Sequence, residues 1–151
     1  MLEDGITMPT FSCDIETDGI DATKVWCVAV QDVHTEDTNI FYNADEFNAW
    51  LDGQTLVFHN GIAFDVPMLE KLWGSDFSNI VVEDTMLLSQ LDNPRRDGGH
   101  SLANWGEYLG YPKGDHEDWS KLSDEMVEYC IQDVKITTKV YKLMMQKGLS
   151  K

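Results

Sequence analysis

The chain has 151 residues, 42% of them hydrophobic and 11% aromatic, which is enough to bury the core of one globular domain. Its 27 acidic residues outnumber 11 basic ones, and the net charge of −16 argues against nucleic-acid binding through a generally basic surface. No apolar run approaches the roughly 20 residues of a membrane span, and residues 1–4 lack the basic and apolar regions of a signal peptide. Cys13, Cys27 and Cys130 lie far apart in apolar contexts, which predicts buried free thiols rather than a disulfide or a zinc site. We therefore expect a cytoplasmic protein with no membrane partner.

In chain order, a loose arm over residues 1–8 precedes three predicted strands, joined by short turns typical of an antiparallel meander. Strands then alternate with helices, which predicts an α/β domain with a mixed sheet. No repeat or linker divides residues 1–151, so we expect a single domain. The predicted strands cover about residues 9–15, 25–31, 38–42, 55–58 and 79–82, and the predicted helices about residues 44–51, 62–72, 85–91, 101–109 and 123–146. The expected caps are Asn43, Asp84, Ser101, Gly110 and Ser123, and residues 111–121 are predicted to be irregular.

Two carboxylates end the first predicted strand. Asp14 and Glu16 are two residues apart, so their side chains share one face of the strand while Ile15 points into the other layer. Two like charges on one face repel each other, and a divalent cation with hard oxygen ligands would relieve that repulsion. The plainer alternative is a solvated strand end that runs into the acidic turn Asp18-Gly19.

A third carboxylate, Asp65, stands among apolar residues shortly after His59-Asn60-Gly61, where a strand gives way to a helix. That junction is a usual place for a ligand site in an α/β sheet. The alternative is structural: Asn60-Gly61 forms a turn, and Asp65 interacts favourably with the helix dipole.

The last predicted helix carries a fourth carboxylate, Asp133, one turn after Tyr129 and therefore on the same face. Aspartate is a poor residue for the middle of a helix, and this one has apolar neighbours. The alternative is a local hydrogen bond between tyrosine and carboxylate on a solvated face. We interpret Asp84 as an N-cap rather than a ligand.

Together, Asp14-Ile15-Glu16, Asn60 through Asp65 and Tyr129 through Asp133 resemble, in order and spacing, the three exonuclease motifs of the DEDD (DnaQ-like) 3′–5′ exonucleases. A tyrosine four residues before the last aspartate is typical of the DEDDy branch. The DEDDh branch has histidine five residues before it, where this chain has Glu128. The resemblance covers nearly the whole chain and is strongest to the proofreading domain of podophage A-family DNA polymerases, through Phe58-His59-Asn60-Gly61, Phe64-Asp65-Val66-Pro67, Asp84-Thr85, His100-Ser101-Leu102, Trp105-Gly106 and Leu109-Gly110.

The resemblance implies an RNase H-like (DnaQ-like exonuclease) fold with a mixed five-stranded sheet flanked by helices. It also implies hydrolysis of phosphodiester bonds by two divalent metal ions, magnesium or manganese, with release of nucleoside monophosphates. The implied metal ligands are Asp14, Glu16, Asp65 and Asp133, and Tyr129 would orient or help deprotonate the attacking water. Residues implied to hold the 3′-terminal nucleotides are Thr17, His59, Asn60 and Phe64, with sequence-tolerant stacking on Phe64.

The leading hypothesis is thus a 3′–5′ exonuclease acting on single-stranded DNA ends, with proofreading as one role, in a bacterial host's cytoplasm if a phage encodes it. RNA trimming stays open, because the sequence does not separate DNA from RNA. Competing functions are a binding module that docks a polymerase or another protein through its acidic surface, and an internal cutter of hybrids. Because the chain stops at Lys151, a free-standing enzyme and a fragment of a polymerase both fit, and its segment from Gly110 to Leu122 looks shortened. The five tryptophans are spread along the chain and can serve the core or the cleft, which favours a monomer.

Overall fold

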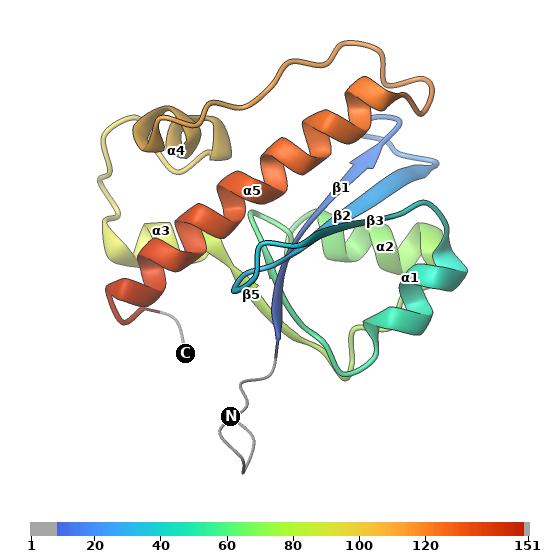
Figure 1. The fold of residues 1–151 in the computed structure, drawn as a ribbon, viewed down its shortest axis with the longest axis horizontal. Coiled ribbons are helices and arrows are strands. Elements are labelled where there is room, and N and C mark those ends of the chain that lie inside the picture. The colour runs from blue at the N-terminus through green and yellow to red at the C-terminus, as the bar shows by residue number, and fades with distance from the viewer. Residues whose placement is uncertain (1–8, 150–151) are drawn as a thin grey trace.

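The structure, a computed structural model, describes residues 9–149 and is built on a mixed five-stranded sheet flanked by helices (Figure 1). The predicted arm over residues 1–8 lies outside the described residues. The strands are β1 (Thr10–Thr17), β2 (Val25–Asp32), β3 (Thr38–Phe41), β4 (Thr55–Phe58) and β5 (Val81–Asp84). The helices are α1 (Ala44–Leu51), α2 (Asp65–Trp73), α3 (Thr85–Asp92), α4 (Leu102–Leu109) and α5 (Asp124–Gln146).

The sheet has the strand order β3-β2-β1-β4-β5, so β1 lies at its centre. β1, β2 and β3 pair antiparallel, which confirms the predicted meander, whereas β4 is parallel to β1 and to β5. β4 pairs only with the first part of β1, up to Ser12 opposite Val57. In the described part of the chain, the later half of β1, which carries Asp14 and Glu16, therefore has no strand partner on the β4 side.

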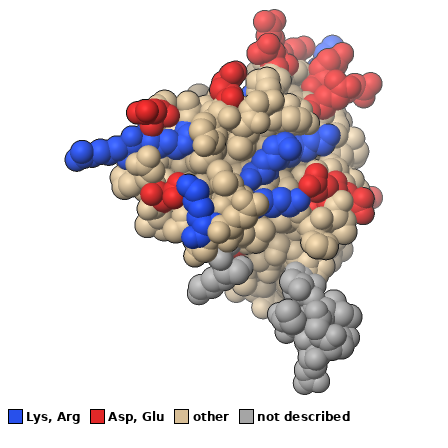
Figure 2. All heavy atoms as spheres, turned by 60° about the vertical axis from the view of Figure 1, so that its left-hand side comes forward, with Lys and Arg blue, Asp and Glu red and all other residues tan. Residues whose placement is uncertain are grey.

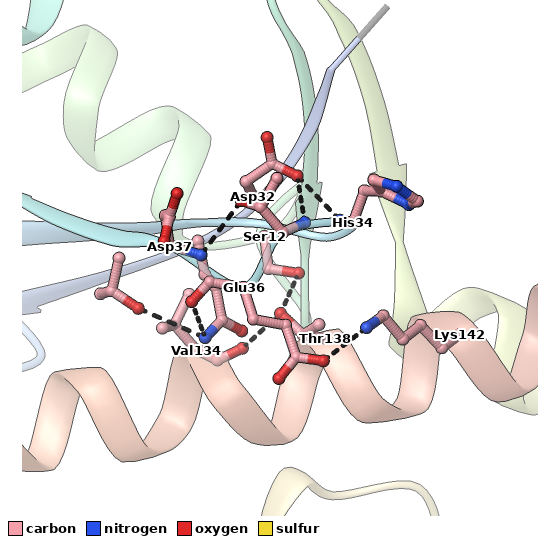
Figure 3. Close-up of polar contacts among 11 residues, drawn as sticks. Ser12, Asp32, His34, Glu36, Asp37, Val134, Thr138 and Lys142 are labelled. Carbon is pink, nitrogen blue, oxygen red and sulfur yellow. Dashed lines mark hydrogen bonds and ion pairs between the residues drawn. The ribbon is translucent and has the colours of Figure 1, made fainter. Parts of the chain in front are cut away.

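Two layers of helices cover the sheet, and the residues of β1 alternate between them. Cys13 and Ile15 pack into the core that α1 and α2 share, which confirms the predicted direction of Ile15. Ser12 faces the other layer, where Thr138 of α5 donates a 2.8 Å hydrogen bond to its hydroxyl (Figure 3). Because side chains alternate along a strand, Asp14 and Glu16 face α5 as Ser12 does.

Side-chain caps begin four of the helices as predicted. Oxygens of Asn43, Asp84, Ser101 and Ser123 accept a backbone N–H at the starts of α1, α3, α4 and α5, respectively. Gly110 ends α4 with a left-handed φ of 71°. The sequence therefore determines where most helices begin.

Three predicted boundaries are wrong. α2 begins at residue 65 rather than 62, because residues 61–64 form a turn, and Pro67 then falls in the first helical turn, where no N–H bond is lost. β5 covers residues 81–84 rather than 79–82, because its parallel pairing with β4 places Val81 opposite Thr55. β1 continues to residue 17 because its pairing with β2 continues that far.

The remaining composition-based expectations concern tryptophans, cysteines and membranes. Trp50 and Trp73 pack against the core under α1 and α2, and Trp105 is buried beneath α5. All three cysteines are buried free thiols, as predicted. Between residues 9 and 149, no helix combines the length and the apolar character needed to cross a membrane.

Candidate active site

The candidate site lies at the end of β1, beyond the residues of β1 that pair with β4. Asp14 and Glu16 point toward α5, and a register shift between Glu16 and Thr17 interrupts the pairing with β2 directly after them. Such bulges are frequent beside active sites, because they re-aim side chains. The following turn is fixed by Asp18, which accepts hydrogen bonds from residues 23 and 24, and these bonds lower its pKa to about 2.

Asp65 approaches the same place from the other helical layer. It is the first residue of α2 and is 6% exposed, and its carboxylate accepts a hydrogen bond from the backbone N–H of Ile15. Asp65 thus caps the part of β1 that β4 leaves unpaired. Burial and the charge of nearby Asp14 raise the pKa of Asp65 well above its ordinary value.

The loop between β4 and α2 is tightly constrained. Asn60 has a left-handed φ of 64°, and a Cβ at Gly61 would lie 2.1 Å from the Cβ of Phe58, so only glycine fits there. The carboxylate of Asp84 accepts hydrogen bonds from the Asn60 and Ile62 amides at 2.8 and 3.2 Å. The predicted N-cap role of Asp84 is confirmed, and the same side chain also holds this loop.

Asp133 comes from the middle of α5, on the face that packs against the sheet, and it is 4% exposed. Its Oδ2 lies 3.3 Å from Nζ of Lys113, which also forms a hydrogen bond with the Tyr129 side chain. Its Oδ1 is buried without a hydrogen-bond partner among the described residues. Buried polar atoms are nearly always paired in proteins, so this oxygen can still accept a hydrogen bond from water or bind a cation.

The irregular segment over residues 111–121, which is irregular as predicted, brings Lys113 to the site. It runs from α4 to the start of α5 (Figure 1). The indole N–H of Trp26 donates to the carbonyl of Trp119 at 2.9 Å, and the rings of Trp119 and Tyr129 meet edge to face, 5.5 Å between centroids. These contacts fix the segment beside Tyr129.

The carboxylates form one cluster. Donor atoms of Asp14, Glu16 and Cys130 all lie within 4.8 Å of one another, and a group of this kind could hold a metal ion. Asp133 and Asp65 each interact electrostatically with Asp14. The structure therefore places Asp65 and Asp133 near enough to Asp14 to interact with its charge, while the donor atoms that converge within 4.8 Å are those of Asp14, Glu16 and Cys130.

Burial and mutual repulsion dominate the electrostatics of this cluster. Burial, with the charge of Asp133, raises the pKa of Asp14 to about 8, and burial beside Asp14 raises that of Glu16 to about 11. Burial raises the pKa of Asp133 only to about 6, because the cation of Lys113 opposes it. The cluster holds more acid than its surroundings neutralise, and carboxylate oxygens suit Mg²⁺ or Mn²⁺.

Two of the predicted nucleotide-binding residues line a pocket beside the cluster. Thr17 and Phe64 border this pocket of about 320 Å³ together with Glu16, Ile20 and Trp119. Ile20 is 87% exposed, so its side chain is accessible to a ligand at the pocket. The pocket thus offers apolar walls within reach of the carboxylates.

The other two predicted residues are placed differently. Asn60 is exposed in its constrained loop. His59 uses both ring nitrogens inside the fold, at 2.7 Å from the Thr85 hydroxyl oxygen and 2.8 Å from the His100 carbonyl. A substrate contact by His59 would require one of these hydrogen bonds to break, and burial lowers the pKa of its ring.

Sequence reasoning missed Lys113, Cys130, Ile20 and Trp119. Cys130 had a usable signal, because it lies three residues before Asp133 and hence on a neighbouring helix position. No sequence signal identifies Lys113 or Trp119, because they belong to an irregular segment that has neither helical nor strand periodicity. Their positions depend on how that segment runs alongside α5.

A family model described as "3'-5' exonuclease" matches residues 1–148. The chain belongs to this 3′–5′ exonuclease family. The exonuclease is 28% identical over 190 aligned residues to the DNA-directed DNA polymerase of Escherichia phage T7, covering 91% of this chain and 26% of the relative. The polymerase of Enterobacteria phage T3 gives the same identity and coverage. The chain thus spans about a quarter of the length of the curated relatives that it matches.

Solved structures confirm the predicted RNase H-like exonuclease fold. Brucella melitensis NrnC with bound Mg²⁺ is similar with a TM-score of 0.69 and 20% identity, over 95% of this chain and 75% of that one. Phi29 DNA polymerase complexed with primer-template DNA and incoming nucleotide substrates is similar with a TM-score of 0.66 and 18% identity, over 96% of this chain and 32% of that one. The predicted membership of the DnaQ-like exonucleases is likewise confirmed, and this family generally uses divalent metal ions.

Proposed function

We propose that this exonuclease removes nucleotides from the 3′ end of single-stranded DNA and releases nucleoside monophosphates. The observation that carries the proposal is that the donor atoms of Asp14 and Glu16 converge at the end of β1, with Asp65 and Asp133 close enough to interact electrostatically with Asp14. Three of these carboxylates are buried and Asp14 is half-buried, and they outnumber the one neighbouring cation, Lys113, which fits a divalent cation better than any purely structural role.

In this proposal Asp14, Glu16 and Asp133 are direct metal ligands, and Asp65 supports the second ion through water. Bound there, two Mg²⁺ or Mn²⁺ ions would activate a water and stabilise the leaving oxygen. The unpaired Oδ1 of Asp133 supports this assignment. Lys113 neutralises the other oxygen of Asp133 and so limits the repulsion within the cluster.

Tyr129 is proposed to orient the attacking water. Its hydroxyl forms a hydrogen bond with Lys113, and its ring rests against Trp119. Burial raises the pKa of Tyr129 further above neutrality, so the hydroxyl keeps its proton at pH 7. A protonated tyrosine can position a water by hydrogen bonding, which favours an orienting role over that of a base.

The 3′-terminal base is proposed to enter the pocket between Phe64, Ile20 and Trp119. Stacking on such side chains needs an unpaired base and tolerates any sequence, which favours a single strand as substrate. Thr17 lines the pocket beside Glu16, and Asn60 is exposed in the loop before α2. His59 supports that loop through its two internal hydrogen bonds.

Lysine and arginine side chains are available locally for contacts with phosphates, despite the net charge of −16. On the side that carries α3, α4 and the end of α5, Lys and Arg side chains lie beside acidic ones (Figure 2). A hollow of about 410 Å³ on α5 is lined by Lys135, Lys139 and Lys142, and also by Glu36, which forms an ion pair with Lys142. Such a region can hold a DNA backbone without a generally basic surface.

A proofreading role beside a DNA polymerase, in the cytoplasm of a bacterial host, is the setting we propose. The phage relatives are DNA polymerases, and the chain covers about a quarter of each. We further propose that residues 1–151 act as a single monomeric exonuclease domain, because the tryptophans serve the core and the site.

The test is digestion of a 5′-labelled single-stranded DNA with Mg²⁺ or Mn²⁺, beside EDTA and the Asp14→Ala protein. The further substrates are an RNA of the same sequence and a circular DNA. The Asp37→Ala protein, which lacks an exposed acidic side chain, is the control variant. We expect a ladder that shortens from the 3′ end of linear DNA only, absent with EDTA and with Asp14→Ala. Digestion of RNA alone would assign RNA trimming, cutting of the circle would assign an internal nuclease, and no digestion at all would favour a binding module.

A further inference from the structure

Cys130 places a thiol at the edge of the carboxylate cluster. It lies on α5 with no exposed surface, and its Sγ is 3.5 Å from the main-chain oxygen of Asp14 and 3.6 Å from Oδ2 of the same residue. In residues 9–149, Asp14, Glu16 and Cys130 are the group of metal-ligand types whose donor atoms converge within 4.8 Å. The proposed reaction assigns no role to this sulfur.

The spacing of these donors suits a metal that binds both oxygen and sulfur. Mg²⁺ and Mn²⁺ take oxygen ligands, so with them the thiol only donates a weak hydrogen bond to Asp14. In a tetrahedral zinc site, ligand distances of about 2.0 Å to oxygen and 2.3 Å to sulfur place the two ligand atoms roughly 3.5 Å apart. The observed separation of Asp14 Oδ2 and Cys130 Sγ is 3.6 Å.

A second observation supports a cation here independently of the thiol. Oδ1 of Asp133, on the same helix as Cys130, is buried and has no hydrogen-bond partner in the described part of the chain. Asp133 also interacts electrostatically with both Asp14 and Glu16. A cation held by Asp14, Glu16 and Cys130 would therefore also compensate the charge of Asp133.

We propose that Asp14, Glu16 and Cys130 bind a thiophilic divalent metal ion of the Zn²⁺ or Cd²⁺ class, which competes with the hard cation of the exonuclease reaction. The metal–sulfur bond forms as the S–H bond of Cys130 breaks, and the proton passes to solvent. No electron is transferred, and both carboxylates bind in their ionised form. Only the competition rests on the proposed function, because the thiophilic site is defined by its own three ligands.

The neighbouring thiols provide matched controls. Cys13 lies on the opposite face of β1, in the core under α1 and α2. Cys27 lies on β2 opposite Glu16 and contacts Cys130, yet it is not part of the converging group. The Cys27→Ala protein therefore keeps the proposed ligands while removing a thiol of equal burial.

The experiment uses Cd²⁺ alone as the probe, titrated into the metal-free full chain with a non-thiol reductant. The readout is the ultraviolet sulfur-to-cadmium charge-transfer absorption. We expect the wild type and Cys27→Ala to show a saturable band, and both Cys130→Ser and Cys130→Ala to lose it. Loss of one ligand should weaken Cd²⁺ binding by at least about ten-fold, and Asp14→Asn should weaken it similarly.

Excess Mg²⁺ should displace the band, because both kinds of metal share Asp14 and Glu16. A band that persists in both Cys130 variants, a band lost equally in Cys27→Ala, or Cd²⁺ binding without a band would overturn the proposal. Failure of the proposed function would look different: the wild type would digest no DNA with Mg²⁺, while the band and its loss in the Cys130 variants would remain.

Discussion

Replacing Asp14 by asparagine should stabilise the metal-free protein. Burial and the charge of Asp133 raise the pKa of Asp14 from 3.8 to about 8, so the folded state disfavours the ionised form. Asparagine has nearly the same shape and no charge. The substitution therefore removes an unfavourable ionisation while it keeps an oxygen that can accept a hydrogen bond from Cys130.

The size of the effect follows from the pKa. A medium at pH 7 lies about three pH units above the ordinary value for aspartate, and each unit corresponds to about 1.4 kcal/mol. That difference sets an upper bound of about 4 kcal/mol on the free energy by which Asp14 destabilises the folded state at pH 7. Solvent access and relaxation of the neighbouring groups reduce it, so we expect a gain of about 2 kcal/mol in unfolding free energy. For a chain of this size the gain corresponds to a rise of roughly 4–8 °C in Tm.

Thermal and urea unfolding at pH 7 in EDTA measure this gain, and the same scans with Mn²⁺ measure the linked metal binding. Wild type should be stabilised by Mn²⁺ more than Asp14→Asn, because the variant has lost a ligand. Asp37→Asn, at an exposed position, should stay within about 0.5 kcal/mol of wild type. A metal-free Asp14→Asn protein that is less stable than wild type would refute the electrostatic reasoning.

Three further predictions concern pH, charge and packing. Because the cluster's folded pKa values lie above the ordinary 3.8 and 4.5, the folded state binds extra protons from about pH 4 up to about pH 6 at Asp133, pH 8 at Asp14 and pH 11 at Glu16. The free energy of unfolding of the metal-free protein should therefore fall as the pH rises, by about 1.4 kcal/mol per pH unit for each such proton. Urea unfolding in EDTA from pH 5 to pH 8 tests this, and a free energy of unfolding that rises with pH would contradict it. Lys113→Met should raise the pKa of Asp133, measured by NMR titration, and lower the free energy of unfolding by about 1–2 kcal/mol at pH 8. Lys135→Met is the control: among the described residues Lys135 forms no ion pair with Asp133, so its loss should leave that pKa in place. Gly61→Ala should lower unfolding free energy by about 2–3 kcal/mol through overpacking, while Gly114→Ala, whose nearest contact would be 3.7 Å, should be nearly neutral in the same unfolding assay.

The sequence alone determined features that depend on spacing within one element. Asp14 and Glu16 share a face because a strand repeats every two residues, and Tyr129 and Asp133 share a face because a helix repeats every 3.6. Caps such as Ser123 act on amides only a few residues away, so they too can be identified locally. The order of strands and helices followed from these local patterns, whereas the family was indicated by the resemblance of three sequence motifs to those of known exonucleases.

Only the tertiary structure decided which residues meet from different elements. Asp65 reaches the Ile15 amide because β4 stops short along β1, and this depends on the register of the two strands. Lys113 pairs with Asp133 because an irregular segment runs alongside α5, and Cys130 meets Asp14 because α5 packs closely on β1. Backbone geometry fixes distances within an element, whereas distances between elements depend on packing of the whole core.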